Sequence, residues 1–362
     1  MQPLIITIKQ ASATYPVYVG RDLLDEVGRL ATPRGRVFVI TSEALRARFG
    51  DRVAASFEPA ADVIVVEEGE SAKTLQNAER IVTALLDRGA KRDSMVVVVG
   101  GGMLGDTAGF AASIFLRGID LVQVPTTLLA QVDSSIGGKV AVNHPRGKNL
   151  VGSFHPPRAV FSDTAVLRTL PPNELLSGLF EAMKGGVIAD PVLFSLFEER
   201  HKEILALEPA LVEELVERAI RVKAEIVSAD EREADLRRLL NYGHTIAHGI
   251  EEAMQYRGIT HGEAVAWGMI GANAVAVRRD VLEEAARQRI DATIRAYGPS
   301  RLPLLDPAAI LAATEHDKKN TGSERIMVLP RRVGACEVFG VSDDDVRFGI
   351  DEVLGVASAG SE

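Results

Sequence analysis

Met95-Val-Val-Val-Val-Gly-Gly-Gly-Met-Leu-Gly-Asp106 is the stretch that indicates the fold of this chain. The apolar run Met95–Val99 has the length of one buried strand, and the glycines after it match the spacing Gly-x-Gly-x-x-Gly. A helix is expected to follow and to continue to about Phe115. Glycines in such a turn let backbone N–H groups approach a pyrophosphate, so the pattern favours a dinucleotide site. A tight turn without a ligand is the alternative reading, and Asp120 is a possible acidic partner for the ribose.

Strand and helix signals alternate on both sides of this stretch. The expected strands are Leu4–Ile8, Tyr15–Tyr18, Val37–Thr41, Val63–Val66, Leu121–Val124 and Val160–Ser162. Helices are expected between them, one capped by Asp22 and ending at Leu30, and another from Thr74 to about Arg88. Strands separated by helices predict a mostly parallel sheet, and therefore an α/β, Rossmann-like nucleotide-binding domain.

From about Pro171 the pattern changes to helices. The expected helices are Pro172–Lys184, Pro191–Leu207, Pro209–Ala229, about Ala234–Met254, His261–Arg279, Leu282–Tyr297 and one that starts at Ser342, with a hairpin of Arg325–Leu329 and Ala335–Phe339. The sequence thus predicts two domains, a nucleotide-binding domain over residues 1–168 and a mainly α-helical domain over residues 169–362.

Composition excludes several classes of protein. The chain has 362 residues, 46% hydrophobic and 25% charged, which is an ordinary globular balance. Its 41 basic and 50 acidic residues give a net charge of −9, which argues against a nucleic-acid surface but not against a local basic pocket. Cys336 is the only cysteine, so neither an internal disulfide nor a cysteine-based zinc site is possible. No signal peptide or membrane span is recognisable, and we expect a cytoplasmic protein.

A second group of unusual residues follows the strand that ends at Pro125. Thr126 and Thr127 can cap a helix and bind a ligand, and Asp133 precedes a Ser-Ser-x-Gly-Gly turn. Lys139, Arg146 and Lys148 come within the next residues. In an acidic protein, cations gathered beside glycines suit an anionic ligand. A solvated loop with ordinary surface lysines is the alternative.

Three of the seven histidines fall between His244 and His261. His244 and His248 are four residues apart and share one face of a helix, and His261 opens the next helical run. Neutral imidazole is a common ligand for zinc and similar metals. Glu181 supplies a carboxylate upstream, and Lys184 lies on the same helix face. Histidines partly buried in helices, with hydrogen-bond partners, are the alternative to a metal site.

Together these residues resemble the 3-dehydroquinate synthase family of the sugar-phosphate cyclase superfamily. The resemblance runs from about Glu68 to Gly334. It rests on Gly100-Gly-Gly-x-x-Gly-Asp106, Gly109-Phe110, Arg117-Gly118, Pro125-Thr-Thr-Leu-Leu, Asp133-Ser-Ser-x-Gly-Gly-Lys139, Gly147-Lys-Asn149, Thr169-Leu-Pro, Glu181-x-x-Lys184, Leu240-Asn-x-Gly-His-Thr, His248 and His261-Gly-Glu-Ala-Val265. It implies a nucleotide-binding α/β domain followed by a helical domain that binds metal and substrate, with the site in the cleft between them.

The resemblance also implies a role for each matching residue. Glu181, His244 and His261 would hold a divalent metal, zinc or cobalt. Residues expected to contact NAD are Glu68, Gly69, Glu70, Ser71, Ala72, Lys73, Gly102, Met103, Leu104, Gly105, Asp106, Thr126, Thr127, Lys139, Lys148, Val166, Leu167, Arg168 and Thr169. Residues expected to act on the substrate are Asp133, Asn149, Lys184, Lys223, Arg237, Asn241 and His248, with one of Lys318 and Lys319. Arg117 would reach the neighbouring site in a homodimer.

The implied substrate is 3-deoxy-D-arabino-heptulosonate 7-phosphate, and the implied product is 3-dehydroquinate of the shikimate pathway. NAD would oxidise C5 transiently, phosphate would leave by β-elimination, hydride would return, and an intramolecular aldol step would close the carbocycle. Three rivals remain open at this point. They are another sugar-phosphate cyclase, a metal-dependent alcohol or glycerol dehydrogenase of the same fold, and a non-catalytic binding protein.

Overall fold

The computed structural model describes residues 3–233, 235–314 and 325–358. The chain packs as two compact units, Met1–Leu170 with Val212–Glu231, and Pro171–Leu211 with Arg232–Glu362. The first division lies two residues from the expected boundary, but Val212–Glu231, expected in the second domain, packs with the first. Lys223 Nζ in this segment bonds to Asp133 Oδ1, and Ser228 Oγ accepts a hydrogen bond from the backbone N–H of Lys9.

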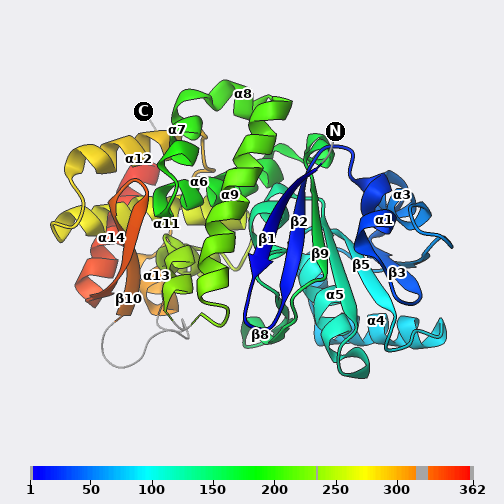
Figure 1. Ribbon diagram of the computed structural model, residues 1–362. Coiled ribbons are helices and arrows are strands. Elements are labelled where there is room, and N and C mark those ends of the chain that lie inside the picture. Colours follow the sequence, from blue (N-terminus) through cyan, green and yellow to red (C-terminus); the bar gives the residue numbers. More distant parts are fainter. Residues whose placement is uncertain (1–2, 234, 315–324, 359–362) are drawn as a thin grey trace. The chain divides into compact units, whose positions relative to one another are not determined.

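The first unit is built on one seven-stranded sheet. Its strands are β1 (Leu4–Lys9), β2 (Thr14–Gly20), β3 (Val37–Thr41), β4 (Asp62–Val65), β5 (Met95–Gly100), β6 (Asp120–Pro125) and β9 (Ala159–Asp163), in the order β1-β2-β9-β6-β5-β3-β4. Only β1 is antiparallel to its neighbour, so the predicted mostly parallel sheet is confirmed. Figure 1 shows this sheet in the blue to green part of the chain.

Helices cover both faces of the central strands. On one face, α4 (Leu75–Asp87) and α5 (Gly102–Ile114) pack against Phe38, Ile40, Val96 and Val98. On the other, α1 (Val27–Ala31) and α3 (Asp51–Ala55) pack against the alternate residues of the same strands. Because both faces are buried, β5 reads as an unbroken apolar run rather than as an alternating one. The other short helical segments of this unit are α2 (Glu43–Leu45) and turns at Leu24–Glu26 and Arg46–Gly50.

A hairpin that the sequence did not predict follows the helical turn Ala130–Ser134. Its strands are β7 (Lys139–His144) and β8 (Gly147–Phe154), and they pair antiparallel. Lys139 lies opposite Phe154, whereas Lys148 lies at the other end, beside the turn that joins His144 to Gly147. The two lysines are therefore separated by the length of the hairpin, and the single cation cluster expected from the sequence does not form there.

The second unit is mainly helical. Its elements are α6 (Pro172–Ile188), α7 (Pro191–Glu199), α8 (His201–Leu205), α10 (His244–Ala253), α11 (His261–Arg278), α12 (Glu284–Ala296), α13 (Pro307–Thr314), β10 (Arg325–Arg332), β11 (Ala335–Val341) and α14 (Asp343–Ser358), and α9 (Pro209–Ala229) extends from this unit into the first. Every residue of α11 from Gly262 to Ala276 is buried, so this helix forms the centre of the unit. Among the described residues, no helix has the length and apolar character needed to cross a bilayer.

Two expected helices are interrupted. Pro191–Leu207 breaks at Arg200, and the expected helix from Ala234 to Met254 is instead a 3₁₀ turn, Leu236–Asn241, followed by α10. The break lies at Gly243, whose φ is +82°. A Cβ on Gly268 of α11 would lie 2.0 Å from the Gly243 carbonyl oxygen. This close approach to α11, together with the left-handed backbone, explains why a continuous helix is excluded.

Candidate active site

Four of the predicted NAD segments follow the carboxyl ends of parallel strands in the first unit. Residues 68–73 come after β4, 102–106 after β5, 126–127 after β6 and 166–169 after β9. The strands β4 and β5 flank β3 on opposite sides, so the order of the sheet reverses next to β5. Ligands of open α/β sheets bind at such a reversal, beyond the carboxyl ends of the strands. The arrangement suits a dinucleotide.

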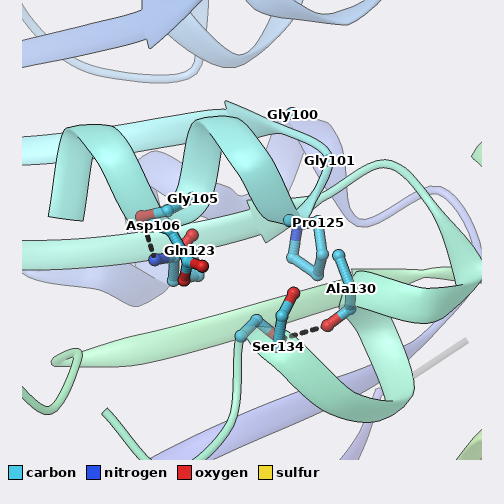
Figure 2. Close-up of a pocket in the computed structure, with 10 residues that line it drawn as sticks. Gly100, Gly101, Gly105, Asp106, Gln123, Pro125, Ala130 and Ser134 are labelled. Carbon is cyan, nitrogen blue, oxygen red and sulfur yellow. Dashed lines mark hydrogen bonds between the residues drawn. The ribbon is translucent and has the colours of Figure 1, made fainter. Parts of the chain in front are cut away.

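The glycine turn after β5 lines a small pocket (Figure 2). Gly101 caps α5 without a side chain, so the N–H groups of the first helical turn are left for a ligand. A Cβ on Gly102 would lie 2.7 Å from Ser134 Oγ. That hydroxyl is buried and has no hydrogen-bond partner among the described residues. A cradle of glycine backbone beside an unsatisfied hydroxyl fits the pyrophosphate of a dinucleotide. Ser134 was not among the predicted residues, although it lies in the Asp133-Ser-Ser motif.

A buried ion pair joins two of these segments. Lys73 Nζ lies 2.5 Å from Asp106 Oδ2. Burial raises the pKa of the Asp106 carboxyl, and the charge of Lys73 opposes that rise. Asn143 ties the hairpin to the same place, because its Nδ2 donates to Glu70 Oε1 at 2.7 Å and its backbone N–H donates to the Lys73 carbonyl at 2.8 Å. The loop 68–73, α5 and the tip of the hairpin that carries Lys148 are thereby held together.

Fewer side chains of the segment after β9 can contact a cofactor than the sequence predicted. Val166 and Leu167 have buried side chains, and Val166 belongs to the core on one face of the sheet, so these two side chains do not face a cofactor. Arg168 and Thr169 are exposed. Asp163 stabilises the bend before this segment, because its carboxylate accepts from the backbone N–H of Ala165. The same carboxylate accepts from the N–H of Asp22. Asp22 has a φ of +56° and does not cap the first helix, contrary to the expectation from the sequence.

Asp120 is excluded as the ribose partner. It lies opposite Met95, at the amino end of β6, whereas the glycine turn lies at the carboxyl end of β5. Its carboxylate pairs with Arg34 at 2.9 Å instead. Thr126 lies at the correct end, and its N–H donates to the Gly100 carbonyl at 3.0 Å. The neighbouring Thr127 Oγ1 accepts from the N–H of Ala130, as expected for a helix cap.

Two predicted substrate residues of the first unit bond to each other. Lys223 Nζ of α9 donates to the Asp133 carbonyl and to its carboxylate Oδ1, each at 2.5 Å. The lysine is buried and the aspartate partly so. Asn149 is exposed in β8 with φ of +54°, and its N–H donates to Asn143 Oδ1 at 2.9 Å. The ammonium group of Lys223 and the exposed side-chain amide of Asn149 can both bind an oxygen-rich ligand.

The second unit brings Glu181, His244 and His261 together from three helices. The ligand atoms of the three residues all lie within 4.8 Å of one another. Glu181 Oε1 is 3.7 Å from His244 Nε2 and 3.5 Å from His261 Nε2. In a tetrahedral zinc site with bonds of about 2.0–2.1 Å, neighbouring ligand atoms lie roughly 3.4 Å apart. The measured separations therefore match a divalent metal site that leaves one position for another ligand.

Both histidines are oriented for such a site. His261 Nδ1 lies 3.3 Å from Glu251 Oε2, and His244 Nδ1 lies 3.3 Å from the Tyr242 carbonyl. When each Nδ1 donates its proton to these acceptors, each Nε2 keeps its lone pair for the metal. Glu251, which faces His261, was not among the residues predicted from the sequence. Glu251 lies seven residues after His244, two helical turns away on the same helix face, and this spacing could have indicated it from the sequence.

Glu181 is suited to be the anionic ligand. It is buried on α6, and neither carboxylate oxygen has a hydrogen-bond partner among the described residues. Lys184 Nζ does lie 2.5 Å from Glu181 Oε2, as an ion pair without hydrogen-bond geometry, and donates to the Leu240 carbonyl at 2.8 Å. A buried carboxylate with an open Oε1 is costly unless a cation meets it. The donor set therefore fits a divalent ion.

Three of the remaining predicted residues of this unit, Arg237, Asn241 and His248, lie on the stretch of chain around His244. The His248 ring lies 5.4 Å from that of His244 and 6.3 Å from that of His261, outside the set of ligand atoms. Arg237 is buried in the 3₁₀ turn, with 3% of its surface exposed. Asn241 Nδ2 at the end of the turn donates to Glu233 Oε1 at 3.0 Å. Lys318 and Lys319 lie outside the described residues.

Comparisons with known proteins agree with this geometry. The family model for the 3-dehydroquinate synthase N-terminal region matches residues 63–177, and the model for the C-terminal region matches residues 178–320. A curated relative, the 3-dehydroquinate synthase of Desulforamulus reducens, is 41% identical over 342 residues, which cover 92% of this chain and 95% of that protein.

Two solved structures are also similar. A 2-deoxy-scyllo-inosose synthase complexed with carbaglucose-6-phosphate, NAD+ and Co2+ has a TM-score of 0.87 and 30% identity, covering 96% of this chain and 99% of that one. The 2-epi-5-epi-valiolone synthase of Streptomyces hygroscopicus, with NAD+ and Zn2+ bound, has a TM-score of 0.86 and 28% identity, covering 95% and 98%. Both share the arrangement of an α/β unit and a mainly helical unit.

Proposed function

Because this chain belongs to the 3-dehydroquinate synthase family, we infer that it is a phosphate-eliminating lyase of the shikimate pathway. It converts 3-deoxy-D-arabino-heptulosonate 7-phosphate into 3-dehydroquinate and phosphate. Its cofactors are NAD and a divalent metal, zinc or cobalt. The observation that carries this proposal is the convergence of Glu181 Oε1 with the Nε2 atoms of His244 and His261, in a chain that also has a glycine cradle for a dinucleotide.

The first unit would hold NAD. The N–H groups that open α5 would donate hydrogen bonds to the pyrophosphate, with Ser134 Oγ as a further donor. The pair of Lys73 and Asp106 would keep the loop 68–73 closed against α5. Thr126, Thr127, Lys139, Lys148 and the segment 166–169 complete the proposed NAD contacts, through the backbone alone at Val166 and Leu167.

The second unit would hold the metal through Glu181, His244 and His261. When bound, NAD+ accepts and returns a hydride, and the divalent ion polarises a hydroxyl of the substrate. The protein's own contribution is to fix these groups. Glu251 and the Tyr242 carbonyl face the Nδ1 atoms of the two imidazoles, and this contact directs each Nε2 toward the metal. Burial keeps water away from Glu181, which strengthens its charge interactions.

Seven further residues would bind and orient the sugar phosphate. Lys184, Lys223 and Arg237 are buried cations suited to its carboxylate and phosphate groups. Asp133, Asn149 and Asn241 would hold hydroxyl groups through hydrogen bonds. His248 lies beside the ligand histidines without joining their ligand atoms, so it would hold or move a proton near the reacting carbons.

The fate of NAD separates this function from that of a dehydrogenase with the same fold. A cyclase returns the hydride that it removes, so NAD+ far below the substrate concentration should support complete turnover. Inorganic phosphate should appear one-to-one with substrate consumed, without lasting absorbance from NADH. Product analysis after incubation with the heptulosonate phosphate measures both. Stoichiometric NADH would favour the dehydrogenase, and turnover of a different sugar phosphate alone would favour another cyclase.

We also propose a cytoplasmic homodimer in which Arg117 reaches the neighbouring site. Arg117 is exposed in a turn with φ of +71°, and Ile114 and Phe154 nearby are 50% and 44% exposed. Ser153 Oγ donates to Ser113 Oγ at 2.7 Å, which joins the end of α5 to β8 beside these two apolar residues. Sedimentation analysis should give twice the chain mass, and Phe154→Asp should shift it toward the monomer. A monomeric wild-type protein would contradict the dimer, and cell fractionation tests the location.

A further inference from the structure

A line of hydrogen-bonded polar groups, buried at its beginning, leads from the residues beside His244 to Glu352 of α14. Tyr242 supplies the carbonyl that faces His244 Nδ1, and its own hydroxyl donates to Asn273 Oδ1 at 2.5 Å. Asn273 Nδ2 then donates to Asp291 Oδ1 at 2.7 Å. The side chain of Asp291 meets Arg287 at 3.5 Å, and Arg287 donates to Glu352 at 2.6 Å.

The first three side chains of this line are buried, so each of their polar atoms needs a hydrogen-bond partner. Tyr242 and Asn273 have no exposed surface, and Asp291 is buried on α12. Losing one partner would leave a buried polar group unsatisfied, which is costly in an apolar interior. Asn273 can satisfy Tyr242 and Asp291 together only with its amide in this single orientation.

Tyr242 lies between two groups of predicted site residues. It follows the 3₁₀ turn that carries Arg237 and Asn241, and it precedes Gly243 and His244. The turn ends on Tyr242, whose N–H donates to the Leu239 carbonyl at 3.1 Å. The next residue, Gly243, lies against α11. When Tyr242 is held in place, the 3₁₀ turn before it and His244 after it are held in place as well.

We propose that Tyr242, fastened by Asn273 and Asp291, is a positioning residue that sets both the metal ligand His244 and the anion-binding turn before it. The hydroxyl anchors the side chain in α11, and the backbone carbonyl of the same residue orients the imidazole. Asn273 acts through Tyr242, and Asp291 acts through Asn273. The inference rests on the proposed function, since it takes His244 as a metal ligand and Arg237 as a substrate ligand.

The test compares two tyrosines of the same unit. Tyr297 is also buried, and its hydroxyl donates to the Phe197 carbonyl at 3.1 Å, away from the metal ligands. Tyr242→Phe and Tyr297→Phe each remove one buried hydroxyl and one hydrogen bond. Both should lower the unfolding temperature. Only Tyr242→Phe should weaken zinc and cobalt binding, by roughly tenfold, at the low end of the range of about 10- to 100-fold for groups that orient metal ligands.

Three measurements distinguish positioning from plain structural support. Competition with a chromophoric chelator gives the metal affinity, and the visible absorption of the cobalt-loaded protein reports the geometry around the ion. Substrate KM reports the Arg237 turn, and it should rise in Tyr242→Phe. Asp291→Asn keeps an acceptor for Asn273 Nδ2 and should retain metal affinity, whereas Asn273→Ala should weaken metal binding as Tyr242→Phe does.

The outcomes separate two kinds of failure. If Tyr242→Phe and Asn273→Ala lose stability like Tyr297→Phe but keep wild-type metal affinity and cobalt spectrum, the positioning role is overturned and the metal site stands. If Tyr242→Phe does not fold, Asn273→Ala carries the same comparison. A wild-type protein that binds no divalent metal would overturn the metal site, and the positioning role with it.

Discussion

Replacing His261 by alanine should remove the metal and at least 100-fold of the activity. His261 Nε2 is one of three atoms that converge around a common point, and Glu181 Oε1 lies 3.5 Å away. Loss of groups that merely orient a ligand costs about 10- to 100-fold in affinity or activity, and losing the ligand itself should exceed that range. Wild-type protein should contain about one divalent ion per chain, and His261→Ala should contain almost none, by elemental analysis after dialysis.

Two matched variants give this prediction its controls. His201→Ala removes a histidine of the same unit whose ring meets that of Tyr297 edge to face, outside the triad, and it should keep both metal and activity. Glu251→Gln removes the charge behind His261 but keeps the side-chain shape, and it should weaken metal binding by about 10- to 100-fold. Full activity of metal-free wild-type protein, or normal metal content in His261→Ala, would contradict the assignment.

Metal binding should also depend on pH in a defined direction. Burial opposes the charge on His261, but the carboxylates of Glu251 and Glu181 outweigh this effect and raise the pKa of the metal-free imidazole above its ordinary value. A metal must displace that proton, so affinity should fall as the pH decreases through this raised value. The fall should begin at a higher pH than for a free imidazole, and in Glu251→Gln it should move to lower pH. Chelator competition at several pH values measures it.

Arg237→Ala should weaken binding of the sugar phosphate far more than binding of NAD+. Arg237 is 3% exposed in the turn directly before the metal-ligand helix, whereas the proposed NAD residues lie in the other unit. Removing one side of a buried, charged hydrogen bond costs about 2–5 kcal/mol, which corresponds to a loss of roughly 30- to 5,000-fold in affinity. Calorimetric titration with substrate and, separately, with NAD+ measures both affinities.

The neighbouring Arg238 is the matched control for this experiment. It lies in the same 3₁₀ turn but is only partly buried, so Arg238→Ala should change substrate binding little. Equal losses of NAD+ and substrate affinity in Arg237→Ala would show that Arg237 is structural. Substrate binding that survives the substitution unchanged would remove it from the proposed anion-binding set.

The α/β class of the first unit could be predicted from local signals. The strand Met95–Gly100 is apolar throughout because helices cover both of its faces, and the glycines after it open α5 as their pattern indicates. Strand signals were equally clear at Val37–Thr41, because β-branched and aromatic side chains favour strands. The hairpin of β7 and β8 was missed, because the side chains of β8 are mostly exposed and of mixed character, although Val140 and Val142 of β7 are buried at alternate positions.

The candidate site divides in the same way. The sequence by itself determined which residue types could bind metal and phosphate, since imidazole, carboxylate and ammonium groups are recognisable from their spacing. Only the tertiary structure decided which of them meet. Glu181 lies 63 positions before His244, and their approach to 3.7 Å depends on α6 and α10 both packing against α11. The register of β6 excludes Asp120, and helix packing in the second unit places Glu251 beside His261 and ends the expected helix at Gly243. These outcomes depend on neighbours outside the local pattern, which therefore carries no information about them.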